Sequence, residues 1–299
     1  MRTFLRRARK VTLGAILILL IWILLPLDGL TLLLVSPHPA NIIRYNGGHR
    51  TALVDLTGTQ SSGVAHSAPL RDQWSKRADV VVVEYNRVRF DGRQTAYDTY
   101  LKLREWGYQQ VILNGSSLGG LLATDVIDFD RAAGGHIKFV VMMQGVPMGE
   151  NDLYQSGTGA LSKIWWPGVV TNVVATDLFW TFTFNPPPRS ELGSGVNDQQ
   201  LAAHYKASST YPLSGWKGEI RYIVTHEGYA RNQYVGIPLI YMEAEHDGVV
   251  KPNTDRWKEV FGGATVIKVP QSTHIGFVEY PDRWRTAFTA AFNLLPPGW

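Results

Sequence analysis

Two spacings of apolar residues alternate along most of this chain. Short apolar runs predict strands over residues 41–45, 51–56, 79–85, 110–113, 137–143, 237–242 and 264–269. Apolar residues at helical spacing predict helices over 70–76, 95–106, 118–129, 251–261 and 282–294. We expect the first two strands to form a hairpin through Asn46-Gly47-Gly48, and strand 79–85 to be buried on both faces. Strands that alternate with helices indicate an α/β fold with a mostly parallel sheet.

The most informative junction between a strand and a helix lies at residues 111–120. Residues 115–119 read Gly-Ser-Ser-Leu-Gly, which matches the pattern G-x-S-x-G. Between a strand and a helix, this pattern predicts a sharp turn that strains the backbone of the central serine and exposes its hydroxyl. Gly115 and Gly119 allow the strand and the helix to approach closely. We therefore predict Ser117 as a nucleophile and the backbone N–H of Leu118, at a helix N-terminus, as a donor to an oxyanion.

Two further residues stand where a serine nucleophile would need them. Asp247 follows strand 237–242, and His274 follows strand 264–269. The carboxyl ends of parallel strands lie at one edge of a sheet, so these residues can converge on Ser117. A serine needs an adjacent base, and a histidine base needs a carboxylate that fixes its tautomer. The order Ser–Asp–His predicts a catalytic triad, with Glu150 or Asp152, after the preceding strand, as the alternative acid.

The regular pattern of strands and helices is interrupted between Gly149 and Tyr234. This stretch has few strand signals, and Pro186-Pro187-Pro188 divides it. We expect a cap of helices and loops, residues 149–235, inserted between two parts of a core domain, 37–148 and 236–299. The large aromatic residues of the cap can form its own core or line an apolar pocket. They are Trp165, Trp166, Phe179, Trp180, Phe182, Phe184 and Trp216.

Residues 1–36 have a composition of their own. Five basic residues and no acidic residue stand in the first ten positions, and 19 of the 25 residues from 11 to 35 are apolar. The uncharged stretch 11–27 is, at 17 residues, at the low end of what spans a bilayer. We therefore expect a single-pass membrane anchor, with the basic tail in the cytoplasm and the folded part on the extracytoplasmic side. Secretion after cleavage of a signal peptide is the alternative, although no A-x-A-like site follows the apolar core.

Charge and composition exclude several other functions. The net charge of +4 comes from the tail: removing its five basic residues from the 29 Lys and Arg leaves 24, against 25 Asp and Glu, a net charge of −1. We therefore expect no nucleic-acid partner. Cysteine is absent, which excludes disulfides and a lipidated-cysteine anchor. His226-Glu227 begins like H-E-x-x-H, but Ala230 stands where the second histidine must be, so we expect no catalytic zinc. No glycine-rich nucleotide motif opens a helix.

The motif and the order of the candidate residues resemble the α/β-hydrolase superfamily, over nearly the whole chain from about residue 51 to residue 299. The resemblance implies a mostly parallel sheet flanked by helices, with the cap inserted at 149–235. The N-terminal transmembrane helix, predicted from the composition of residues 1–36, precedes this α/β fold. It also implies Ser117 as the nucleophile, Asp247 as the acid after the penultimate strand and His274 as the base after the last. Serine at position 117 separates the chain from dehalogenase-like relatives, which have an aspartate nucleophile.

The resemblance also places the oxyanion hole. Thr57-Gly58-Thr59 lies where the family usually has His-Gly-x, whose final residue donates a backbone N–H to the oxyanion. By this correspondence Thr59 is the second donor, beside Leu118. In this chain Thr57 stands where the family pattern has histidine, and a backbone donor at Thr59 does not depend on that side chain.

Taken together, the sequence predicts a membrane-anchored serine hydrolase that cleaves carboxylic esters through an acyl-enzyme, with no cofactor and no metal. An aromatic cap without a cluster of basic residues favours a small-molecule or lipid-derived ester with an apolar acyl group. The triad does not separate esters from amides or thioesters, nor hydrolysis from acyl transfer. A non-catalytic binding protein of the same fold is the alternative from another class, and an intact triad argues against it.

Overall fold

The computed structural model describes residues 40–45, 47–59, 61–86, 90–154, 213–226, 228–274 and 276–299. The predicted membrane anchor, residues 11–27, and most of the predicted cap lie outside these ranges. Within them, no helix has the length and the apolar character needed to cross a membrane.

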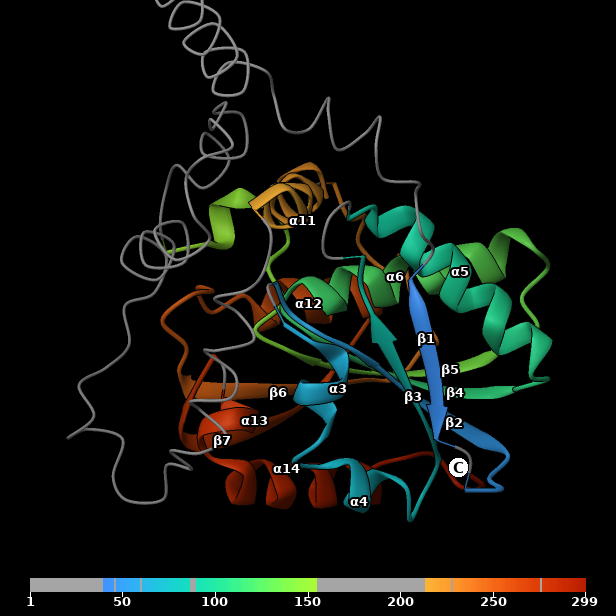
Figure 1. Ribbon diagram of the computed structural model, residues 1–299. Helices are drawn as coiled ribbons and strands as arrows, with labels where there is room; N and C mark the ends of the chain where they lie inside the picture. Colours follow the sequence, from blue (N-terminus) through green and yellow to red (C-terminus); the bar gives the residue numbers. More distant parts are fainter. Residues whose placement is uncertain are drawn as a thin grey trace, which may run out of the picture.

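A seven-stranded sheet forms the centre of the described molecule (Figure 1). Its strands are β1 (Asn41–Tyr45), β2 (Thr51–Leu56), β3 (Asp79–Glu84), β4 (Gln110–Ser116), β5 (Lys138–Gln144), β6 (Leu239–His246) and β7 (Thr265–Thr273). They lie in the order β1-β3-β2-β4-β5-β6-β7. Only β1 runs antiparallel to its neighbour, so the predicted mostly parallel sheet is confirmed.

The predicted hairpin between the first two strands is wrong, because β3 lies between them. β1 pairs with one side of β3 and β2 with the other. The connection from β1 to β2 passes over the start of β3, where Asp79 Oδ1 accepts hydrogen bonds from the backbone N–H groups of Gly47 and His49, both at 2.9 Å. This carboxylate holds the connection in a wider turn than a hairpin has. β3, whose first five residues are buried, occupies an interior position in the sheet, as its run of valines predicts.

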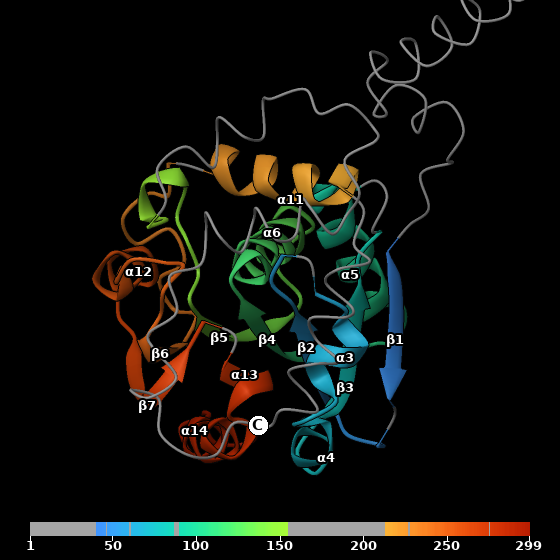
Figure 2. The same cartoon turned by 60° about the vertical axis from the view of Figure 1, so that its left-hand side comes forward.

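Helices cover both faces of the sheet (Figures 1 and 2). One face packs against α5 (Gly92–Glu105), α6 (Leu118–Ala132), α11 (Leu213–Thr225) and α12 (Thr254–Phe261). The other packs against the short helices α3 (Gly63–Ser67), α4 (Arg71–Trp74) and α13 (Gly276–Glu279), and against α14 (Pro281–Asn293). Side chains of alternate strand residues enter one hydrophobic core or the other.

Most predicted elements are present with shifted ends. α5 begins three residues before the predicted helix, since the Asp91 side chain caps it by accepting from the N–H of Gln94 at 3.0 Å. β7 continues to Thr273 through Pro270, which an edge strand tolerates. The sequence did not predict α3 or α13, whose five and four residues are too short to show a helical period.

The described part of the predicted cap includes α11, which packs against the core. Trp216, Ile220 and Ile223 of this helix are buried in the same hydrophobic core as α5 and α6. A Cβ atom on Gly218 would lie 2.9 Å from the carbonyl oxygen of Phe90, so the helix crosses close to the segment that leads into α5. Figure 2 shows α11 above α6 and α5. Trp216 therefore belongs to this hydrophobic core.

Candidate active site

Ser117 occupies a strained turn between β4 and α6. Its backbone angles are φ 51° and ψ −120°, a conformation rare for a residue with a side chain. A Cβ atom on Gly119 would lie 1.9 Å from the carbonyl oxygen of Leu56, and one on Gly115 would lie 2.5 Å from the Cα of Gly120. Both positions therefore require glycine if strand and helix are to meet at this distance. This is the geometry that lifts a serine hydroxyl above the end of a sheet.

The loop after β2 lies beside Ser117. A Cβ atom on Gly58 would lie 3.2 Å from Ser117 Cβ and 3.8 Å from its Oγ. The predicted oxyanion donor, Thr59, is the next residue, and its carbonyl oxygen accepts from the Ser61 hydroxyl at 3.3 Å. On the other side of Ser117, Leu118 is the first residue of α6, so its backbone N–H has no acceptor within the helix. The two segments that the sequence analysis assigned to the oxyanion hole thus flank the serine.

Asp247 and His274 form a hydrogen-bonded pair. His274 Nδ1 lies 2.9 Å from Asp247 Oδ2, and the two side chains are only 11% and 14% exposed. The other carboxylate oxygen, Oδ1, accepts from the backbone N–H groups of Val249 at 2.9 Å and Val250 at 2.8 Å. These two bonds fix the carboxylate, and the carboxylate in turn orients the ring so that Nδ1 donates and Nε2 can accept a proton.

The pair lies next to Ser117 at the end of β5. The carbonyl oxygen of Gln144 accepts from the N–H of Ser117 at 2.9 Å. A Cβ atom on the following residue, Gly145, would lie 2.6 Å from Asp247 Oδ2 and 2.7 Å from His274 Nδ1. All three predicted triad residues directly follow the ends of parallel strands, β4, β6 and β7, and gather at one edge of the sheet. The described residues show no hydrogen bond between Ser117 and His274.

The alternative acid Asp152 has other partners. Its Oδ2 accepts from the backbone N–H of Met148 and from Asn253 Nδ2, both at 2.8 Å, and its Oδ1 accepts from Arg256. These bonds tie the turn after β5 to the start of α12. The other alternative, Glu150, begins a 3₁₀ turn at Glu150–Asp152. It is Asp247 whose carboxylate meets the ring of His274.

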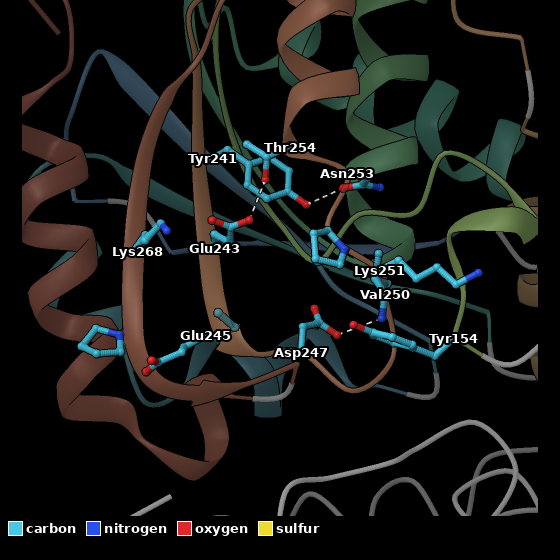
Figure 3. Close-up of a pocket in the computed structure, with 14 residues that line it drawn as sticks. Tyr154, Tyr241, Glu243, Glu245, Asp247, Val250, Lys251, Asn253, Thr254 and Lys268 are labelled. Atoms are coloured by element: carbon cyan, nitrogen blue, oxygen red, sulfur yellow. Dashed lines mark hydrogen bonds between the residues drawn. The ribbon is translucent and has the colours of Figure 1, made fainter.

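A pocket of about 400 Å³ opens on the side of Asp247 (Figure 3). Four charged side chains, Glu243, Glu245, Lys251 and Lys268, line it together with Asp247. Burial raises the pKa of the Tyr241 hydroxyl, which also lines it, above its ordinary value, so the neutral hydroxyl donates to Asn253 Oδ1 at 3.1 Å. Among the described residues, the lining includes neither Ser117 nor His274. This pocket lies behind the acid, and the predicted apolar acyl pocket falls outside the described residues.

Three polar residues near the site were missed by the sequence analysis. Asp55 of β2 and Asn114 of β4 are fully buried. Their side chains form a hydrogen bond, in which Asn114 Nδ2 donates to Asp55 Oδ1 at 2.8 Å. His66 of α3 lies 2.9 Å from the other oxygen of Asp55. The sequence did carry a signal for Asp55 and Asn114, because each is a polar residue within a strand that is otherwise largely apolar.

No protein-family model matches the chain, and no curated protein sequence matches it either. Solved structures do. An esterase from Rhodococcus sp. ECU1013 has a TM-score of 0.62 at 17% identity, over 86% of this chain and 96% of its own. A type II thioesterase from the borrelidin biosynthetic cluster has a TM-score of 0.56 at 20% identity, over 84% and 96%. An alpha/beta hydrolase family protein from Desulfitobacterium hafniense has a TM-score of 0.61 at 14% identity, over 85% and 100%. Together with the parallel sheet and its flanking helices, these likenesses show that the chain has the α/β-hydrolase fold, as the resemblance in its sequence implies.

Proposed function

We propose that this protein is a serine hydrolase that cleaves carboxylic esters through an acyl-enzyme. The observation that carries the proposal is the Asp247–His274 pair, bonded at 2.9 Å beside a strained Ser117. A strained backbone persists only where the surrounding structure imposes it, and such residues concentrate at functional sites. The fold is shared with esterases and thioesterases, which fits the proposal without specifying the substrate.

In the proposed reaction, His274 Nε2 takes the proton of the Ser117 hydroxyl as the oxygen attacks the ester carbonyl carbon. The carbonyl oxygen takes the π electrons of the C=O bond and becomes the oxyanion of the tetrahedral intermediate. The proton then passes from Nε2 to the leaving alcohol oxygen as the C–O bond breaks, which leaves the acyl group on Ser117. Water repeats the sequence: its proton goes to Nε2, its oxygen attacks the acyl carbon, and Ser117 departs with that proton. Asp247 stays ionised and stabilises the imidazolium.

The backbone N–H groups of Leu118 and Thr59 are the proposed donors to the oxyanion. An N–H at a helix N-terminus carries part of the positive end of the helix dipole, which favours negative charge there. Donors of this type are fixed before the reaction, so no reorganisation is needed when the charge develops. The missing Ser117–His274 hydrogen bond fits an enzyme without substrate, because such bonds are often long until a substrate binds.

The finer parts of the proposal come from the sequence. An apolar acyl group is expected from the aromatic residues of the cap, and association with a membrane from the stretch 11–27. A thioesterase is the second candidate, because a solved structure of the same fold is one.

The test uses purified protein with p-nitrophenyl esters and matched thioesters of two to sixteen carbons. We expect hydrolysis of esters and stoichiometric labelling of Ser117 by a fluorophosphonate, both lost in Ser117→Ala. Labelling without turnover of any ester or thioester would favour the binding-protein alternative. A thioester preference would replace the ester proposal with the second candidate.

A further inference from the structure

A buried polar cluster of three residues, Asp55, His66 and Asn114, lies below the candidate active site. Asp55 Oδ2 accepts from His66 Nδ1 at 2.9 Å, and Asp55 Oδ1 accepts from Asn114 Nδ2 at 2.8 Å. Asp55 and Asn114 are fully buried, and His66 is 6% exposed. A buried carboxylate is costly unless both oxygens are satisfied, and here each has a donor. We call this group the Asp55 cluster.

The Asp55 cluster joins the three chain segments that carry the proposed catalytic groups. Asp55 lies two residues before the loop 57–59, which holds the proposed donor Thr59. Asn114 lies three residues before Ser117 and directly opposite Asp55 in the β2–β4 register. His66 stacks against Phe277, with ring centroids 4.8 Å apart, and Phe277 lies three residues after His274. The cluster therefore touches the elements of the nucleophile, the oxyanion loop and the base.

The loop between Asp55 and His66 is also held at its two ends by other bonds. The Tyr85 hydroxyl donates to the carbonyl oxygen of Thr57 at 2.8 Å. Glu84 Oε1 accepts from the Ser62 hydroxyl at 2.6 Å and from the N–H of Val64 at 2.7 Å, at the start of α3. Between these anchors, Gly58 contacts Ser117 closely enough that a Cβ atom would lie 3.2 Å from Ser117 Cβ. The described part of the loop that lies closest to the serine is therefore held on both sides.

We infer that Asp55, His66 and Asn114 are positioning residues that hold the oxyanion loop against the nucleophile turn. The inference rests on the proposed function. By fixing the start of the loop at Asp55 and its exit at His66, the cluster keeps the Thr59 N–H at one distance from Ser117. A donor stabilises an oxyanion well only when it lies about 2.7–3.1 Å from the position that the oxyanion occupies. None of the three residues has to touch the substrate for this role.

The experiment exchanges the donor and the acceptor of the hydrogen bond between Asn114 and Asp55. Asn114→Asp alone sets two carboxylates against each other, so the cluster must open or take up a proton. Asp55→Asn combined with Asn114→Asp restores both hydrogen bonds, because the new amide at position 55 can accept from His66 and donate to the new carboxylate. The second oxygen of that carboxylate stands where Asn114 Oδ1 is buried without a hydrogen-bond partner, so the restoration is partial. Asn114→Ser is a milder single variant for use if Asn114→Asp does not fold.

Four quantities are measured in each variant: kcat and KM for the best p-nitrophenyl ester, Ki for a trifluoromethyl ketone of the same acyl chain, and Tm. The ketone forms a hemiketal oxyanion on Ser117 and so reports on the oxyanion hole. We expect the single variants to lower kcat about 10²-fold and to raise Ki by a similar factor, with KM nearly unchanged. The reversed pair should recover part of both losses.

A matched control lies at the opposite edge of the sheet. There Tyr108 donates to the fully buried Asp79 at 2.5 Å, so Tyr108→Phe weakens an equivalent buried carboxylate far from Ser117. We expect this variant to lower Tm without changing kcat or Ki. Single variants of Asn114 with unchanged Ki, or a loss that the reversed pair does not recover, would overturn the inference. So would an equal rise in Ki in Tyr108→Phe. A wild-type protein with no ester or thioester hydrolysis would instead overturn the proposed function, and the inference with it.

Discussion

Replacing Gly145 by alanine tests the proposed triad without changing any of its members. Gly145 has φ +51°, and a Cβ atom there would lie 2.6 Å from Asp247 Oδ2 and 2.7 Å from His274 Nδ1. Ordinary van der Waals contact begins at 3.4 Å. The carboxylate and the ring must therefore each retreat by about 0.7–0.8 Å, and a misplacement of about 1 Å in a catalytic group can cost about 10²-fold in rate.

Gly145→Ala has two effects, strain in the backbone at residue 145 and displacement of the Asp247–His274 pair, and a control variant separates them. An L-residue with positive φ costs about 1 kcal/mol. Gly135 offers a matched control, because it has φ +67° and no atom within 4 Å of a Cβ atom. Gly135→Ala introduces similar strain between α6 and β5 and displaces nothing. Both variants should therefore lose about 1 kcal/mol of stability, and only Gly145→Ala should lose activity.

The assay is kcat/KM for p-nitrophenyl butyrate, with chemical denaturation measured in parallel. We expect about a 10²-fold loss in Gly145→Ala and wild-type activity in Gly135→Ala. If Gly145→Ala retained the wild-type kcat/KM, the Asp247–His274 pair would not be the acid and base of the reaction. Equal losses in the two variants would attribute the effect to strain and also refute the reasoning.

The other predictions concern the triad and the acyl group. Ser117→Ala and His274→Ala should each lower kcat by several orders of magnitude, and the double variant should be little worse than either, because the residues act as a unit. Additive losses measured in the double variant would contradict this. Asp247→Asn should lower kcat about 10⁴-fold at constant Tm, whereas Asp152→Asn should mainly lower Tm; the reverse pattern would make Asp152 the acid. With acyl chains from acetyl to octanoyl, kcat/KM should rise, since each buried methylene contributes about 0.8 kcal/mol; a flat or falling series would contradict an apolar acyl pocket.

The sequence predicted the elements that depend on local patterns. Apolar runs located the seven strands of the described residues, and the places of Ser117, Asp247 and His274 after β4, β6 and β7 predicted that they would meet at one edge. This works because the carboxyl ends of parallel strands share an edge whatever the order of the strands. The pairing of His274 with Asp247, and not with Asp152, depends on one hydrogen bond that spacing alone could not choose.

The order of the first three strands could not be predicted from local patterns. Two adjacent strands with an Asn-Gly-Gly turn between them favour a hairpin. The N–H groups of Gly47 and His49 instead donate to the carboxylate of Asp79, which lies at least thirty residues later in the chain. A long-range contact of this kind leaves no periodic trace in the sequence. The short helices α3 and α13 were missed for the opposite reason, since they contain too few residues to show a period.

Asp55 and Asn114 show what polar residues inside buried strands can specify. A slip of one residue between β2 and β4 would move these two side chains to opposite faces and leave a buried carboxylate with one donor fewer. Their bond therefore selects the one register in which Gly58, two residues after β2, lies beside Ser117, the residue after β4. Two apolar side chains at positions 55 and 114 would also be buried, but a slip of one residue would then cost less free energy, because no buried carboxylate would lose a donor. The polar pair consequently specifies the position of the oxyanion loop relative to the serine, which hydrophobic packing alone would leave less well determined.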